Sequence, residues 1–516
     1  MARHERTEKA LPHRRLAALI GSAACAAVLA AALWIGFSGG GKPAGVLPDT
    51  SVSTAARTDG TGRSLPNGSS GGQASRTEGL TSSPSSTESA APTPGYTDVS
   101  GTDISGTVTT ETGTETAQPP HTTDPPAPAD SDSVPPPTVP TTGPTQPPTD
   151  EPKEQRAVWI SYIELDSWLR GTADAARQRI DALMEACVSC GLNTVLFQVR
   201  PNSNAYYASD CYPVAEAAGR MLKAGLDPLQ YAVEAAHARG LELHAWVNPY
   251  RVGGTSLYAV VEDYFSYGGR VYYIPSSPAV QRLILSGIEE LTERYAVDGI
   301  HFDDYFYPDG SVPADSPASF EEVDFAAYRA AGGTAAVGDG RREQVTALLR
   351  AVYRTAHAHG GVFGVSPVAS FETNREKKYA DVAAWMAASD IVDYICPQIY
   401  FGLQNGSMPF ERVLAQWCAR PRSASVRLYI GLGLYKAGMP EDTWAGSGRY
   451  EWAAGGDILA RELRALRQQE AVSGFALYSY DYLNPERFTR PVNGVQHDAA
   501  VARREIENLR EELKRS

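Results

Sequence analysis

The chain has 516 residues, of which 42% are hydrophobic and 21% charged, and its formal net charge at pH 7 is -14. This acidic balance argues against nucleic acid as a partner, because phosphate binding requires a basic surface. Cys25 lies near the N-terminus, and the other five cysteines are spread between Cys187 and Cys418, a number and spacing that do not make a disulfide framework. The fold is therefore expected to rest on its own hydrophobic core.

The N-terminal segment has the pattern of a membrane anchor. Residues 1–15 contain several arginines and lysines, and residues 16–37 form an almost uncharged apolar run. A bilayer-spanning helix needs about 20 apolar residues, and a basic flank stays on the cytoplasmic side. We predict a cytoplasmic tail over 1–15 and a single transmembrane signal anchor over 16–37, with the rest of the chain outside the cell membrane. A cleaved signal peptide is the alternative. Lipid attachment at Cys25 is disfavoured, because the apolar run continues past it.

Residues 38–154 are dominated by Thr, Ser, Pro, Gly and Asp. Such a segment has too few apolar side chains to offset the entropy lost on ordering. It is predicted to be a disordered linker that gives the following domain reach, for example through a cell wall.

From residue 155 to residue 516 the sequence repeats one unit, in which a short apolar strand is followed by a loop and an amphipathic helix. The expected strands are Arg156 to Leu165, Asn193 to Arg200, Glu242 to Tyr250, Gly299 to Tyr307, Val362 to Ser370, Val392 to Phe401, Arg427 to Lys436 and Gly474 to Tyr482. Eight strands that alternate with helices predict an α/β fold of the (β/α)8 TIM-barrel type. A doubly wound open sheet is the competitor, but no glycine-rich phosphate loop follows the first strand. Residues 498–515 are expected to form either an outer helix or a solvated tail.

Side chains alternate along a strand, so one parity faces the helices and the other faces the barrel interior or mouth. In the third strand every second residue from Leu243 to Val247 is apolar, which sends the polar parity inward. Extended to the other strands, this alternation predicts a mouth lined by Arg200, His244, Trp246, Asn248, His301, Gln398, Tyr400, Tyr435, Tyr478 and Tyr480. Lys436, beside Tyr435, and Arg251, shortly after the third strand, are further substrate-binding candidates.

A mouth that combines aromatic rings with fixed donors and acceptors suits a sugar, whose C–H faces pack on rings and whose hydroxyls need polar partners. The predicted partner is therefore a polysaccharide, and no cofactor is predicted. The alternative is that the aromatic residues only fill barrel layers.

Asp303 and Asp304 stand together at the end of the apolar fourth strand. Glycoside hydrolysis needs one carboxylate at the anomeric centre and a second group that protonates the leaving oxygen. We predict Asp303 as nucleophile or base and Asp304 as acid, with Glu372 and Asp393 as reserves. Neighbours in a strand point to opposite sides, so both aspartates can act only if the backbone turns at Asp304. A purely loop-ordering role for the pair is the alternative.

A metal site is a further alternative, because His244, His301, Asp303 and Asp304 could together hold a divalent ion that activates water. The first strand lacks the closely spaced H-x-H that such barrels often use. Cys187 and Cys190 form a C-x-x-C, but no second pair completes a zinc site.

Several separated motifs carry a resemblance to a known family. They are Arg156-Ala157-Val158-Trp159-Ile160, Leu243-His244-Ala245-Trp246-Val247-Asn248-Pro249-Tyr250-Arg251, Val297-Asp298-Gly299-Ile300-His301-Phe302-Asp303-Asp304-Tyr305, Pro397-Gln398-Ile399-Tyr400 and Leu432-Gly433-Leu434-Tyr435-Lys436. Together they resemble the glycosyl-hydrolase-like family ten of bacterial secreted and lipoprotein barrels. The resemblance covers 156–482 and implies a TIM barrel that cleaves glycan strands, with peptidoglycan as the expected substrate.

The fourth-strand motif also resembles the D-G-F-R-x-D of amylase-type barrels, which implies Asp303 as nucleophile with His301 in place of the arginine. The chain has no glutamate at the end of the fifth strand, so the acid and the choice between retention and inversion stay open. In chitinase-like barrels the catalytic glutamate falls where Tyr305 stands here.

The leading hypothesis is an extracytoplasmic glycoside hydrolase acting on cell-wall polysaccharide. The alternatives are a catalytically silent glycan-binding barrel and a metal-dependent amidohydrolase or deacetylase.

Overall fold

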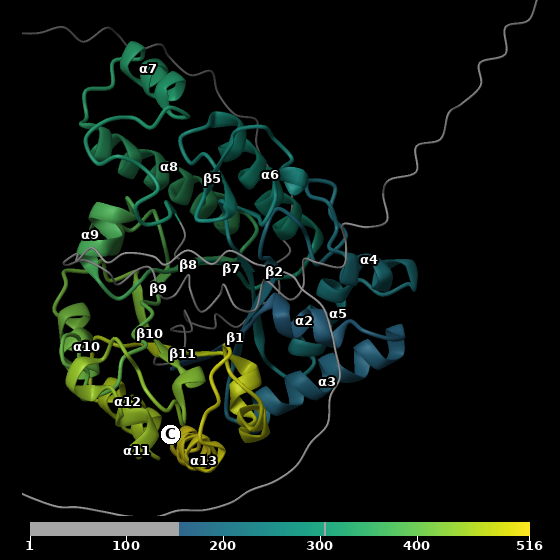
Figure 1. Ribbon diagram of the computed structural model, residues 1–516. Coiled ribbons are helices and arrows are strands. Elements are labelled where there is room, and N and C mark those ends of the chain that lie inside the picture. The colour runs from purple at the N-terminus through teal and green to yellow at the C-terminus, as the bar shows by residue number, and fades with distance from the viewer. Residues whose placement is uncertain (1–153, 304–305, 516) are drawn as a thin grey trace, which may run out of the picture. The chain divides into compact units, whose positions relative to one another are not determined.

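The computed structural model describes residues 154–303 and 306–515 (Figure 1). The predicted tail, the membrane anchor, nearly all of the linker and Asp304 lie outside these ranges, so those expectations stay predictions. Among the helices in the described ranges, none is long and apolar enough to cross a membrane.

Within the described residues, eight parallel strands close into a barrel in the order β1-β11-β10-β9-β8-β7-β3-β2. The helices form a ring around these strands (Figure 1). This arrangement fits a TIM barrel and confirms the predicted α/β barrel. Its strands are β1 (Gln155–Ile160), β2 (Thr194–Arg200), β3 (Glu242–Val247), β7 (Gly299–Asp303), β8 (Val362–Ser366), β9 (Tyr394–Ile395), β10 (Arg427–Gly433) and β11 (Gly474–Tyr478).

The strands start within two residues of their predicted positions, and all except β2, which ends at Arg200 as predicted, end sooner than predicted. The first strand ends at Ile160, because Ser161 caps the short helix α2 (Tyr162–Trp168) in a capping box with Glu164. The alternating pattern that suggested longer strands continues into the loops of the mouth. Alternation alone therefore did not show where the hydrogen-bonded ladder stops.

Helices lie between the strands within the described residues, as the predicted alternation requires. They are α3 (Ala173–Ser189), α4 (Glu216–Lys223), α5 (Pro228–His237), α6 (Pro278–Arg294), α7 (Glu322–Ala330), α8 (Val337–Ala358), α9 (Val382–Ala387), α10 (Phe410–Cys418), α11 (Glu451–Ala454), α12 (Ile458–Arg467) and α13 (Ala499–Leu513). Helix α13 packs against α12 and buries Ile506 and Leu509 completely. The last helix is therefore part of the outer layer and not a solvated tail.

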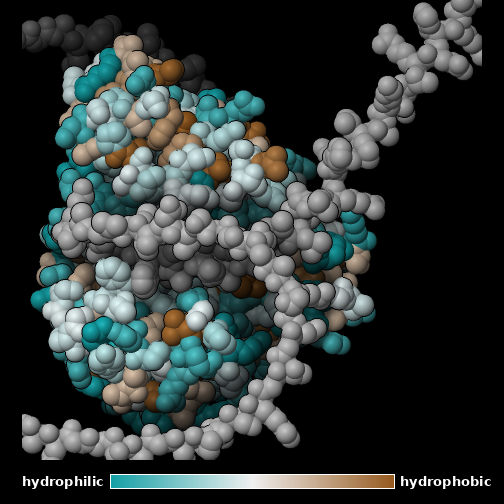
Figure 2. Space-filling model, viewed as in Figure 1, coloured by the Kyte–Doolittle hydropathy of each residue, from teal (hydrophilic) through white to brown (hydrophobic). Residues whose placement is uncertain are grey.

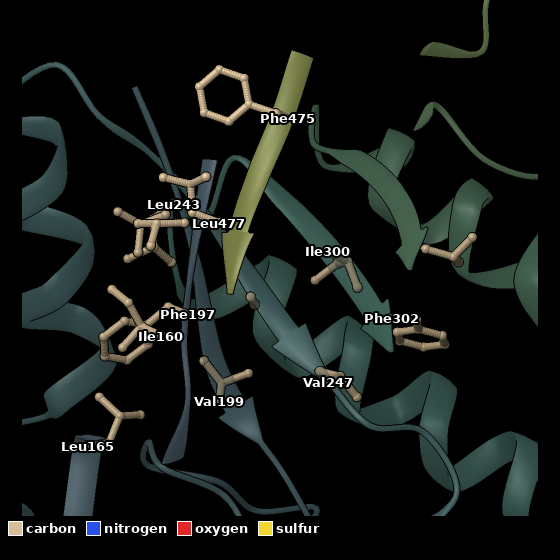
Figure 3. Close-up of a cluster of buried hydrophobic side chains, with 14 of the residues drawn as sticks. Ile160, Leu165, Phe197, Val199, Leu243, Val247, Ile300, Phe302, Phe475 and Leu477 are labelled. Atoms are coloured by element: carbon tan, nitrogen blue, oxygen red, sulfur yellow. The ribbon is translucent and has the colours of Figure 1, made fainter. Parts of the chain in front are cut away.

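Two separate hydrophobic layers confirm the predicted alternation. The outer layer lies between strands and helices and includes Phe197, Leu243, Ile300 and Phe302 (Figure 3). The inner layer fills the barrel with Ala157, Trp159, Leu196, Trp246, Tyr394, Cys396, Tyr429 and Ala476. Each large apolar side chain buried in this way stabilises the fold by about 1.5–3 kcal/mol.

A small additional sheet is inserted between β3 and α6. There β4 (Arg251–Gly253), β5 (Tyr264–Tyr267) and β6 (Arg270–Tyr273) form a small antiparallel sheet in the order β4-β6-β5. Among the coloured residues on the face shown in Figure 2, hydrophobic residues occur as separate spots among hydrophilic ones.

Candidate active site

Asp303 is the last residue of β7 and pairs with Ser366 of β8, which places it at the carboxyl end of the barrel strands. Its side chain is half-buried, and Gln398 Nε2 donates a hydrogen bond of 2.9 Å to its Oδ1. The same amide nitrogen lies 3.3 Å from the carbonyl oxygen of Ser366. Gln398, predicted to bind substrate, therefore holds the carboxylate of Asp303 in a fixed orientation.

Three tyrosines form an aromatic wall beside Asp303. The ring centroids of Tyr400 lie 5.9 Å from Tyr435 and 5.8 Å from Tyr478, and Tyr435 and Tyr478 are 6.2 Å apart. Burial, then Tyr478 and Asp303, raises the pKa of Tyr400 well above its usual range, so its phenol stays neutral. The strand ends thus bring these predicted residues together.

Tyr480 belongs to a 3-10 turn (Tyr480–Leu483) after β11 and meets Trp168 edge-on at 5.5 Å. Trp168 was missed in the sequence. It ends helix α2, which the longer predicted first strand obscured.

His244 and His301 point into the barrel as predicted, but they lie below the mouth. They are only 2% and 0% exposed. The hydroxyl of Tyr394 lies 2.9 Å from His244 Nδ1 and 3.0 Å from His301 Nδ1. The prediction that both histidines line the mouth therefore needs correction, because the interior packing covers them.

The hydrogen bonds of these residues have a defined order. Trp159 Nε1 can only donate, and it donates to His301 Nε2 at 3.1 Å. Burial lowers the pKa of His301 well below 6.5, so the ring is neutral and its proton sits on Nδ1. Nδ1 then donates to the Tyr394 hydroxyl, and that hydroxyl donates to His244 Nδ1. The remaining proton of His244 faces Glu242 at 3.7 Å, at the other end of the barrel.

Trp246 lies in β3 and Asn248 directly follows it, and both are buried, with 3% and 1% of their surface exposed. Gln198 donates to Asn248 Oδ1 at 3.3 Å and accepts from the backbone N–H of Tyr162. Trp246 Nε1 and Asn248 Nδ2 have no acceptor within the described part of the chain. These two donors are suited to oxygen atoms of a bound molecule.

The three predicted cations Arg200, Arg251 and Lys436 are buried. A bulge between Gln198 and Arg200 changes the strand register, and the Arg200 guanidinium lies 4.8 Å from the Tyr212 ring, on the outer side of the barrel. This corrects the predicted inward direction of Arg200. Arg251 is only 3% exposed and belongs to β4, and Lys436 Nζ donates to Asp442 Oδ2 at 2.7 Å in a buried pair.

The reserve acids are at opposite ends of the barrel. Asp393 accepts the backbone N–H of Phe363 at 2.7 Å and pairs with His357, at the amino end of the strands. It is therefore not a candidate acid. Glu372 is exposed in the segment after β8, on the side of the mouth.

Glu164 is a buried carboxyl that the predicted site did not include. It accepts the Ser479 hydroxyl at 3.0 Å and the backbone N–H of Asp481 at 2.8 Å. Burial, then the charge of Asp481, raises its pKa to about 7. Its capping box with Ser161 is visible in the sequence, but its contact with the loop after β11 depends on barrel closure.

Within 154–303 and 306–515, no group of three or more His, Cys, Asp or Glu side chains is arranged to hold a metal ion. Both ring nitrogens of His301 already have partners. Asp304, the fourth residue of the metal-dependent alternative, lies outside the described residues, so that alternative stays a prediction.

Comparisons with known proteins extend this description. The family model described as glycosyl hydrolase-like 10 matches residues 154–445. Glycosyl hydrolase YngK of Bacillus subtilis (strain 168) is 30% identical over 368 residues, which cover 64% of this chain and 69% of that protein. Glycosyl hydrolase DigH of Escherichia coli (strain K12) is 30% identical over 392 residues, 66% of this chain and 86% of DigH. The glycoside hydrolase domain of PgaB (BpsB) from Bordetella bronchiseptica covers 65% of this chain and 97% of its own, at 14% identity and a TM-score of 0.45.

Proposed function

The chain belongs to the glycosyl hydrolase-like 10 family, and we propose from this premise that it hydrolyses glycosidic bonds in cell-wall polysaccharide. The substrate we propose is the glycan strand of peptidoglycan. The names of YngK and DigH support glycoside hydrolysis as the reaction class.

The observation that carries the proposal is the oriented carboxylate of Asp303 beside an aromatic wall. Glycoside cleavage passes through a transition state with positive charge at the anomeric carbon, and a fixed carboxylate stabilises that charge or attacks the carbon. The hydrogen bond from Gln398 keeps Asp303 Oδ1 in place. The rings of Tyr400, Tyr435 and Tyr478 provide apolar faces for sugar C–H groups.

The second group of the reaction must protonate the leaving oxygen. We propose Asp304 for this role, with Glu372 as the reserve. Replacing each by its amide separates the two. The acid is the residue whose loss slows cleavage of natural glycan much more than cleavage of a substrate with an acidic leaving group, which needs no proton.

The test is product analysis with the whole purified chain and its Asp303→Asn variant. Each is incubated with peptide-free glycan strands and with intact peptidoglycan, and soluble products are identified by mass spectrometry. Asparagine keeps an oxygen that can accept from Gln398, so the variant should fold and bind. Oligosaccharides released by the unaltered chain only would support the proposal, and their reducing-end masses would identify the bond. Binding without products from either protein would favour the silent glycan-binding barrel.

We further propose that the barrel acts outside the membrane, carried by the anchor over 16–37 and the linker over 38–154. Protease added to intact spheroplasts should then digest the barrel without lysis. Resistance until the cells are lysed would contradict this location.

A further inference from the structure

Asn248 lies beside Asp303 at the carboxyl ends of two neighbouring strands. In the parallel pair of β3 and β7, Val247 pairs with Phe302, so the next residues of the two segments are Asn248 and Asp303. Trp246 packs in the inner layer of the barrel, and a side chain two positions further along a strand faces the same way. Asn248 is therefore an inward-facing residue at the level of the proposed catalytic carboxylate.

The orientation of the Asn248 amide follows from its hydrogen bonds. The backbone N–H of Tyr162 can only donate, and it donates to Gln198 Oε1 at 2.9 Å. The nitrogen of the Gln198 amide is therefore the atom that donates to Asn248 Oδ1, at 3.3 Å. Gln198 belongs to β2, and β7 lies on the other side of β3. Asn248 Nδ2 is consequently turned away from Gln198, and the strand on its other side is the one that ends in Asp303.

Two buried donors of β3 and its end await an acceptor. Among residues 154–303 and 306–515, nothing accepts from Asn248 Nδ2 or from Trp246 Nε1, although the two residues are only 1% and 3% exposed. Both groups can only donate, and the oxygen of the Asn248 amide is already occupied by Gln198. A carbonyl oxygen has two lone pairs and no proton, so it matches a pair of donors better than a hydroxyl does.

We propose that Asn248, with Trp246, recognises the carbonyl oxygen of an acylated amino group on the sugar whose bond is cleaved. The inference rests on the proposed function, in which Asp303 faces the anomeric carbon. The group beside Asp303 then belongs to the neighbouring ring carbon, which carries the acetamido group in N-acetylated sugars. A protonated free amine at that carbon offers only donors and is rejected by the two N–H groups. The substrate class is therefore a polymer of N-acylated amino sugars.

The test compares two forms of one substrate. Peptide-free peptidoglycan glycan strands are used before and after removal of their N-acetyl groups, and dissociation constants are measured with the whole chain and its Asn248→Ala and Trp246→Phe variants. Where cleavage occurs, kcat and KM are measured as well. The unaltered chain should bind the N-acetylated strands at least about tenfold more tightly. Equal binding of the two forms by the unaltered chain would overturn the inference whatever the variants do.

The matched controls are Asn193→Ala and Trp385→Phe. The side-chain nitrogen of Asn193 donates to the carbonyl oxygen of Glu154 at 2.8 Å, and that of Trp385 donates to Thr346 Oγ1 at 2.8 Å. Asn193 directly precedes β2 at the amino end of the barrel, and Trp385 lies on the outer helix α9. Their loss should lower the melting temperature and leave the preference for N-acetylated strands unchanged.

We expect Asn248→Ala to weaken binding of N-acetylated strands about tenfold and to leave binding of the de-N-acetylated strands as it was. Trp246→Phe should reduce the preference in the same direction. An equal loss on both substrates would assign Asn248 a structural role and overturn the inference while leaving hydrolysis intact. A lost preference in a chain that cleaves neither substrate would support acyl recognition and overturn the proposed reaction. An unaltered chain that binds neither form would overturn both.

Discussion

The deep interior of the barrel and its mouth use the same inward-facing strand positions for different purposes. In the interior, Trp159, His301, Tyr394 and His244 form a continuous series of hydrogen bonds, here called the interior column. At the mouth, Asp303, Tyr435 and Tyr478 are partly exposed, and two buried donors near the end of β3 lack acceptors in the described residues. The comparison teaches that depth along the strand decides the role of an inward side chain: deep positions contribute stability, and positions at the strand ends are available for chemistry.

The largest expected effect is a loss of kcat, and it is tested by comparing two aspartates at opposite ends of β7. Asp303→Asn should lower kcat at least about a thousandfold, because it removes the charge that faces the anomeric carbon, while the melting temperature changes little. Asp298→Asn is the matched control at the other end of β7, where Asp298 accepts the backbone N–H of Leu243 at 2.7 Å. It should lower the melting temperature and keep kcat. Kinetics and thermal melts of both variants test this, and the reverse pattern would assign Asp298 the functional role.

The next effect concerns the interior column. Tyr394→Phe removes the hydroxyl between two buried histidines and leaves an unpaired donor and an unpaired acceptor, which should lower the free energy of unfolding by about 3 kcal/mol. Tyr429→Phe is the control, because its ring packs 4.8 Å from Tyr394 but takes no part in the column. It should cost about 1 kcal/mol or less. Urea unfolding measures both, and equal losses would show that the column does not stabilise the barrel.

Two buried groups, His301 of the interior column and Glu164 beside the loop after β11, make the free energy of unfolding depend on pH in opposite directions. His301 has a pKa lowered well below 6.5 by burial, so its contribution to the free energy of unfolding is complete above pH 6.5 and falls by up to about 1.4 kcal/mol per unit as the pH drops below that. Glu164 has a pKa raised from 4.5 to about 7, so its contribution is complete below pH 4.5 and is lost as the pH rises toward 7.

Between pH 4.5 and 6.5 the two contributions therefore offset each other. Glu164→Gln removes one titration and should make the loss of stability on acidification steeper than in the unaltered chain. Urea unfolding between pH 4.5 and pH 7.5 measures the difference. Parallel pH profiles for the two proteins would contradict the assignment to Glu164.

The smallest effect sharpens the role of Gln398. Gln398→Met keeps the size of the side chain but removes the donor to Asp303 Oδ1, so kcat should fall about tenfold with little change in KM. Gln344→Met, on the outer helix α8, should leave both constants unchanged. A rise in KM without a fall in kcat would instead support the substrate-binding role predicted from the sequence.

The sequence predicted the barrel and its inner and outer faces, because alternation and length are local properties. It did not predict how deep in the barrel each inward-facing side chain lies. His301 and Asp303 have the same parity in β7, yet only Asp303 reaches the mouth, because the stagger of the closed barrel decides which layer each residue enters. Nor did alternation show the bulge that turns Arg200 outward, or the contact of Glu164 with the loop after β11. These features depend on neighbours that are distant in the sequence.

The order of protons in the interior column has an electrostatic consequence. Trp159, which packs on Tyr478 of the aromatic wall, is the first donor, and every later donor points on toward Glu242 at the opposite end of the barrel. The bond dipoles are therefore aligned, with their positive ends toward the carboxylate of Glu242 and their negative ends toward the mouth. A barrel built in this way presents a fixed negative potential to any cationic centre that forms above Trp159, and no reorganisation is needed when that charge appears.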